Sequence, residues 1–260
     1  MNLSDYQNQF DKLISRKEKS TKFQNFRNSY FSEFLKVGLP TQKWEDWRFT
    51  NLSQLKKEKF NISEVHSNSL KRVDLLKYDI EGVITFVFVN GQYQERNQVF
   101  PKGLKVSTGL KDFEPHRINV PPKMSDPFEL LNTAFVDSAL SITIKENIDF
   151  KSPIRFLYLS ENKTNLMISP KIYLKVSNSS SGTFIEEHFS RKGSLFHNQS
   201  TNVKLEKNST LNHIRIQSNS LKTTTINNIT INQKKDSSYN FTQFSEGSGL
   251  SRSNINSYLD

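Results

Sequence analysis

VKLEKNSTLNHIRIQSNSLKTTTINNITI, residues 203–231 of this 260-residue chain, contains short segments in which every second residue is apolar. These alternating pairs are Val203/Leu205, Ile214/Ile216 and Ile229/Ile231. A period of two is typical of β-strands that bury one face. Asn, Ser and Lys separate the segments and no helical pattern lies between them, so the sequence predicts one strand after another.

The same texture begins after about Leu140 and continues to Ile255. Further alternating segments are Ile142/Ile144, Phe156/Tyr158 and Ile172/Leu174/Val176. Strands at such close spacing are typical of a sandwich, a barrel or a β-solenoid, and periodicity alone does not choose among them. A solenoid with rungs of roughly 20 to 25 residues would make about five turns here.

Upstream of this β region, the sequence predicts helices and a short hairpin. Aromatic residues recur at helical spacing between Asp5 and Lys36, and Gly38 with Pro40 gives a plausible stop. Val83–Val89 reads as a strand that ends in the turn dipeptide Asn90-Gly91. Leu104 and Val106 suggest another short strand, and 126–135 reads as a short helix. We therefore expect an N-terminal helical region (1–60), a small α/β segment (61–138) and a β core (139–260).

Composition narrows the functional classes. Zero Cys excludes disulfides, thiolate metal ligands and thiol nucleophiles within these residues. No signal-peptide core and no run of about 20 apolar residues is present, which favours a cytoplasmic protein. A net charge of +10 invites a nucleic-acid or anionic-surface partner. The basic residues are scattered, however, and no aromatic-basic RNA-binding signature occurs, so we expect neither nucleic acid nor membrane as the principal partner.

Few residues suggest chemistry. Phosphate-binding loops, dinucleotide fingerprints and clustered acids are lacking, which predicts no catalytic residue and disfavours a polysaccharide-acting enzyme. Glu186 and His188 alternate and could share a metal, but nothing identifies a third ligand, so a solvated surface pair is expected. His213, Arg215 and Gln217 lie opposite Ile214 and Ile216, which predicts an exposed polar ridge with a possible role in subunit contact. His66, His116 and His197 show no partner pattern.

One segment, GLPTQKWEDWRFTNL (38–52), is similar to the N-terminal signature of the SufB/SufD family. The matching residues are Gly38, Pro40, Lys43, Glu45, Trp47, Arg48 and Thr50. Their physical interpretation is a loop held in place by Trp44 and Trp47, with no implied catalysis. Further similarities follow in the family's order, including 87–93, 101–106, 131–135 and the rung 211–217.

The resemblance covers about 24–260 and is closer to SufD than to SufB. It implies a right-handed parallel β-helix preceded by the N-terminal helical and small α/β regions. It also implies a scaffold subunit that pairs with a SufB-like paralogue and a SufC-like ATPase to build iron-sulfur clusters. The resemblance assigns no cofactor to this chain, since the cluster and ATP are handled by the complex.

Relatives continue beyond the position of Asp260 with more rungs and a helical domain, so we expect a C-terminally truncated chain. The leading hypothesis is a non-enzymatic scaffold for iron-sulfur cluster assembly. The alternatives are a polysaccharide-acting β-helix enzyme, which glycan cleavage would support, and a basic RNA-binding module, which steeply salt-dependent RNA affinity would support.

Overall fold

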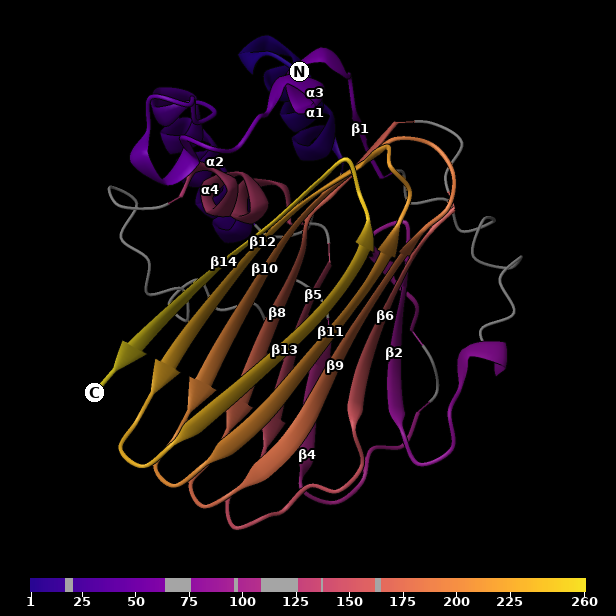
Figure 1. Ribbon diagram of the computed structural model, residues 1–260, viewed down its shortest axis with the longest axis vertical. Helices are drawn as coiled ribbons and strands as arrows, with labels where there is room; N and C mark the ends of the chain where they lie inside the picture. The colour runs from indigo at the N-terminus through magenta and orange to yellow at the C-terminus, as the bar shows by residue number, and fades with distance from the viewer. Residues whose placement is uncertain (17–20, 64–75, 96–97, 109–125, 137, 162–164) are drawn as a thin grey trace.

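A β-solenoid of about four turns, preceded by helices, makes up the chain in the computed structural model (Figure 1). The structure describes residues 1–16, 21–63, 76–95, 98–108, 126–136, 138–161 and 165–260. The helices are α1 (Leu3–Ser15), α2 (Thr21–Val37), the 3-10 turn η1 (Glu45–Trp47), α3 (Ser53–Lys57), the 3-10 turn η3 (Leu76–Tyr78) and α4 (Pro127–Phe135). The predicted mainly-β class and the helices before and within it are confirmed.

Two sheets face each other across the solenoid. Sheet A contains β1 (Asn61–Ile62), β4 (Leu104–Thr108), β5 (Ser138–Ile144), β7 (Leu166–Ile168), β8 (Pro170–Val176), β10 (Leu195–Leu205), β12 (Thr223–Gln233) and β14 (Leu250–Leu259). Sheet B contains β2 (Ile84–Val89), β3 (Gln92–Tyr93), β6 (Ile154–Ser160), β9 (Ser181–Ser190), β11 (Thr210–Asn219) and β13 (Ser238–Gly247). From β9 to β14 successive strands alternate between the sheets, so each pairs in parallel with the strand one turn away. Earlier in the chain, β3 and β4 pair antiparallel with β2 and β5.

The length of one turn can be taken from the strand register. Glu186 pairs with Arg215, and Arg215 pairs with Gln243, so a turn takes about 28 or 29 residues. The predicted rung of 20 to 25 residues was too short. Each turn contains one strand of about ten residues in each sheet, and the corners between them add the rest. The predicted five turns are therefore about four.

Left-handed residues mark the corners after the strands of sheet A. Asn147, Ser179, Asn208 and Asp236 follow β5, β8, β10 and β12, and their φ angles lie between 52° and 58°. Asn and Asp tolerate this conformation better than most side chains. The predicted Asn90-Gly91 turn is confirmed, with φ angles of 50° and 84° between β2 and β3.

The helices cover part of the outward face of sheet A (Figure 1). Asp126 caps α4 by accepting from the Phe128 amide at 2.8 Å. Helix α4 then lies on the sheet through a buried ion pair between Glu129 and Lys171 of β8. Asn132 donates to the carbonyl oxygen of Asn198 in β10 at 2.7 Å. None of the helices in the described ranges is long and apolar enough to cross a lipid bilayer.

The interior of the solenoid is divided between an apolar end and a polar end. The apolar end, near the left-handed corners, includes Phe184, Val203, Leu205, Leu211, Ile229 and Ile231. Toward the other end of the same strands, the inward side chains become charged or polar. This polar end is the most distinctive group of side chains among the described residues.

Candidate functional site: a polar cluster inside the solenoid

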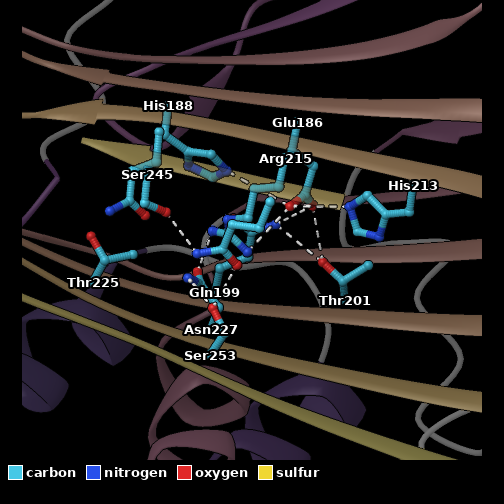
Figure 2. Close-up of polar contacts among 12 residues, drawn as sticks. Glu186, His188, Gln199, Thr201, His213, Arg215, Thr225, Asn227, Ser245 and Ser253 are labelled. Atoms are coloured by element: carbon cyan, nitrogen blue, oxygen red, sulfur yellow. Dashed lines mark hydrogen bonds and ion pairs between the residues drawn. The ribbon is translucent and has the colours of Figure 1, made fainter. Parts of the chain in front are cut away.

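Alternation along β9 and β11 turns five polar side chains into the solenoid. Figure 2 labels Glu186, His188, His213 and Arg215 among them. Glu186 and His188 come from β9, and His213, Arg215 and Gln217 come from β11. The register places Arg215 beside Glu186 and Gln217 beside His188. Each of the five residues is at most 1% exposed. The two strands therefore bring a carboxylate, a guanidinium and two imidazoles together out of contact with solvent.

Glu186 is the centre of this group (Figure 2). Its Oε2 atom lies 3.3 Å from Arg215 Nη1, 3.5 Å from His213 Nε2 and 3.7 Å from His188 Nε2. A carboxylate with no partner would be very costly to bury. Because a cation and two potential donors surround it, the Glu186 carboxylate is stabilised in its ionised form.

Sheet A completes the shell from the opposite side. Gln199 of β10 donates to Glu186 Oε1 at 2.5 Å, and the Thr201 hydroxyl donates to the same oxygen at 3.2 Å. Asn227 of β12 accepts a hydrogen bond from Arg215 Nη2. The cluster therefore bridges the two sheets, and each charged group of the central pair has neutral partners from sheet A.

His213 connects the carboxylate to the next turn. Its Nδ1 atom lies 2.6 Å from the Tyr239 hydroxyl, and its Nε2 atom faces Glu186. The negative charge of Glu186 favours the proton on Nε2, so Nδ1 accepts and the Tyr239 hydroxyl donates. The Glu186 carboxylate, the His213 imidazole and the Tyr239 phenol thus lie next to one another across β9, β11 and β13.

His188 belongs to a second group of rings. It stacks on Tyr158 with ring centroids 4.6 Å apart, and His197 of β10 lies 5.0 Å from it. Among the described residues, Nδ1 of His188 has no hydrogen-bond partner, and Nε2 faces only the Glu186 carboxylate, at 3.7 Å. A neutral imidazole packed as an aromatic ring fits these surroundings better than a charged imidazolium.

The electrostatics of the cluster follow from burial and from one ion pair. Burial alone would raise the pKa of Glu186, but Arg215 and the two histidines outweigh it and hold that pKa well below its usual range. Burial, followed by the charge of Arg215, lowers the pKa of His188 to about 4. Burial likewise places the pKa of His197 well below its ordinary value. At neutral pH Glu186 is therefore ionised, whereas His188 and His197 are neutral.

The predicted outward orientation of these residues is wrong. Glu186 with His188 is not a solvated pair, and His213, Arg215 and Gln217 do not form an exposed ridge. Ile214 and Ile216 instead lie on the outer face of β11, where they are partly buried. The charged side chains can point inward because their counter-charges come from neighbouring turns, which offsets part of the cost of burying them. Their inward position leaves them unavailable to a partner subunit.

The metal site considered for Glu186 and His188 is also not assembled. No group of three or more His, Cys, Asp or Glu side chains within the described ranges is arranged to hold a metal ion. The charged partner of the Glu186 carboxylate is the Arg215 guanidinium. The cluster is therefore an enclosed ion pair with polar neighbours. It can hold the strands in register and fix the tautomer of His213.

Two family models match consecutive parts of the chain. The N-terminal region of SufBD proteins matches residues 2–156, and the SufBD core domain of the SUF iron-sulfur cluster assembly system matches residues 158–260. The chain belongs to the SufBD family. An iron-sulfur cluster assembly SufBD family protein of Synechocystis is 26% identical over 236 residues. That alignment covers 84% of this chain and 52% of the relative, so the chain spans about half the length of the curated relative it matches.

The SufBD signature residues lie away from the polar cluster, at the helical end. Gly38 ends α2 with a φ of 71°, and its amide donates to the Phe34 carbonyl at 2.7 Å. Pro40 and Trp47 are buried, Thr50 is half-buried, and Lys43, Glu45 and Arg48 are exposed. His66 and His116 lie outside the described residues.

Several members of the cluster were missed because they are uncharged or lack a local pattern. Gln199, Thr201 and Asn227 look like ordinary strand residues, and His197 showed no partner. The only sequence signal for these residues is their spacing, which equals one turn of the solenoid. Glu186 and Arg215 are 29 residues apart, and Gln199 and Asn227 are 28 residues apart. That spacing is informative only once the register is known.

Proposed function

We propose that this chain is a non-catalytic scaffold subunit of a SUF iron-sulfur cluster assembly complex. It pairs with a SufB-like paralogue and with a SufC-like ATPase, in the cytoplasm. The observation that carries the proposal is that the two SufBD family models together match residues 2–156 and 158–260. The signature segment 38–52 and the overall layout favour the SufD type over its paralogue.

The proposed mechanism is positional. A solenoid whose strands are linked turn by turn can hold partner surfaces at fixed separations, while the ATPase supplies motion. The enclosed ion pair of Glu186 and Arg215 supports this mechanism, because groups that are fully buried hold neighbouring strands together instead of meeting a substrate.

In this proposal, an iron-sulfur cluster is what the complex assembles and is not a cofactor that this chain holds permanently. The sequence contains no Cys, so these residues offer no thiolate to a cluster. The cluster and ATP are therefore assigned to the assembled complex. SufBD membership and the lack of clustered acids in the sequence both favour the scaffold over a polysaccharide-acting enzyme.

The proposal is tested by affinity purification of the complete protein from its own cells, at two salt concentrations and with and without ribonuclease. The expected result is stable recovery of the SufB-like and SufC-like proteins that survives both treatments. Recovery of RNA whose binding falls steeply with salt, without those proteins, would support the basic RNA-binding alternative and contradict the scaffold. Recovery of neither the SufB-like nor the SufC-like protein would also contradict the scaffold proposal.

A further inference from the structure

Two residues of the signature segment contact the last described strand of sheet A. The Arg252 guanidinium of β14 lies over the Trp47 ring at 4.1 Å from its centroid. Arg252 Nη1 also donates to the Thr50 hydroxyl at 2.9 Å. These contacts join positions about 200 residues apart in the chain. The signature segment is thus in direct contact with the solenoid.

Trp47 is itself firmly held. It is 2% exposed and packs on Phe128 of α4 with ring centroids 5.1 Å apart. Its amide donates to the Trp44 carbonyl at 2.9 Å, and the Thr50 amide donates to the Trp47 carbonyl at 3.0 Å. The indole and the threonine hydroxyl therefore present a fixed surface to Arg252.

Neighbouring residues of β14 contact the same helical region. Asn254 donates to Asn228 of β12 at 2.9 Å and to Asp126, the cap of α4, at 3.4 Å. A Cβ atom at Gly249 would lie 2.6 Å from the side-chain oxygen of Gln54 in α3, so the start of β14 also approaches the helices closely. The outward face of β14 therefore meets α3, η1 and α4 along several residues.

One long edge of β14 has no strand partner among the residues that the structure describes. Within the part of the chain that the structure describes, β14 pairs only with β12, whereas β12 has β10 and β14 on its two sides. A strand with one paired edge opens more readily than a strand paired on both. A contact on its outward face therefore has a larger effect on its position.

We propose that Trp47 and Arg252 form a latch that positions β14 against the N-terminal helical region. The signature segment then acts as a positioning element of the solenoid, with Trp47 as the platform and Arg252 as the residue that engages it. The contacts of the latch lie within this chain and do not depend on the proposed function. Only the purpose of holding β14 in place rests on that function.

The latch is tested in the full chain by hydrogen exchange of the β14 amides. Arg252→Ala is expected to increase exchange in β14 about ten- to thirtyfold while exchange in β9 stays unchanged. Arg252→Lys keeps a cation over the indole and should restore much of the protection. Arg191→Ala, at an exposed arginine after β9, is the matched control. Equal exchange in β14 for the Arg252→Ala and Arg191→Ala variants would overturn the proposal.

Fluorescence of Trp47 gives an independent readout, with Trp44→Phe removing the only other tryptophan. In that background, Arg252→Ala should shift emission to longer wavelength and increase quenching by acrylamide. An unchanged spectrum would contradict the stacked arrangement. If Arg252→Ala does not fold, Arg252→Lys and Trp47→Phe are combined, and fully additive exchange effects would contradict a direct contact. No SUF partner is present, so failure of the latch and failure of the scaffold are distinguishable.

Discussion

At the scale of single residues, the ionised carboxylate of Glu186 depends on one guanidinium and on polar groups from both sheets. The cluster contains Arg215 at 3.3 Å and Gln199 at 2.5 Å, with no solvent access to any of the three. Breaking a buried pair by removing one charge leaves the other uncompensated. Replacing either Glu186 or Arg215 by a neutral residue should therefore lower the free energy of unfolding.

Glu186→Gln tests that cost. We expect a loss of about 3–5 kcal/mol in the free energy of unfolding, because Arg215 would remain buried without a counter-charge. The measurement is urea denaturation followed by circular dichroism, with Glu146→Gln, at an exposed corner, as the control of equal chemistry. The control should change by less than about 0.5 kcal/mol. Equal losses would mean that Glu186 carries no buried charge.

Glu186→Gln also tests the direction of the hydrogen bond between His213 and Tyr239. In the wild-type chain, nitrogen NMR of His213 should show a proton on Nε2, the atom that faces Glu186, with Nδ1 accepting from the Tyr239 hydroxyl. With Glu186→Gln this preference should weaken. A proton on Nδ1 in the wild type would reverse the assigned direction of the hydrogen bond.

Acid pH should destabilise the fold through His188. Its folded pKa of about 4 lies below the ordinary unfolded value near 6.5, so the unfolded state binds more protons between these values. The stabilising contribution is full above about pH 6.5 and is lost as pH falls toward about 4, by an amount on the order of 3 kcal/mol. Asp126, whose pKa burial raises to about 6, contributes a slope of the opposite sign.

Denaturation at several pH values between 7.5 and 4.5 measures this slope, and an NMR titration of His188 assigns it. The wild type should lose stability over that range, and His188→Gln should reduce the dependence, with the remainder coming from His197, whose pKa burial also lowers. A His188 imidazole that titrates near 6.5 would contradict the buried neutral ring.

The alternation of residues was sufficient to predict which side chains share a face, but not which face is buried. Glu186 with His188, and His213 with Arg215, are on common faces as predicted. The inward orientation was missed because Ile214 and Ile216 resemble core residues when β11 is considered alone. The deciding factor is the register with β9, which no local pattern contains.

At the scale of elements, local signals predicted structure well wherever the physical cause is local. A short helix lies at Pro127–Phe135 with Asp126 as its cap, Gly38 ends α2, and Asn90-Gly91 forms the turn after β2. Each follows from the conformational preferences of one or two residues. The rung length was misjudged because it depends on strand length and corner geometry together, and the solenoid itself was chosen by resemblance to a family.

The attachment of α4 to sheet A offers a test at this scale. Lys171 Nζ contacts Glu129 and donates to Thr133 at 2.9 Å, and burial lowers the pKa of Lys171. Lys171→Met and Glu129→Leu should each cost about 3–5 kcal/mol when made singly. The double variant should be less destabilised than either single variant, because no uncompensated charge remains. Additive losses in urea denaturation would contradict a coupled pair.

At the scale of the whole molecule, β13 and β14 each have one long strand edge without a partner among the described residues. Phe244 and Leu259 on these strands are 66% and 77% exposed. Unpaired edges with apolar side chains promote association. The 260-residue polypeptide expressed by itself should therefore self-associate or aggregate. A monodisperse monomer in size-exclusion chromatography with light scattering would contradict this expectation.

The scaffold proposal is tested most directly by native mass spectrometry of the complete protein, mixed with its SufB-like paralogue and SufC-like ATPase. The account predicts an assembly that contains this chain, the paralogue and the ATPase together. Spectra in which this chain stays free, while the paralogue and the ATPase assemble without it, would contradict the account.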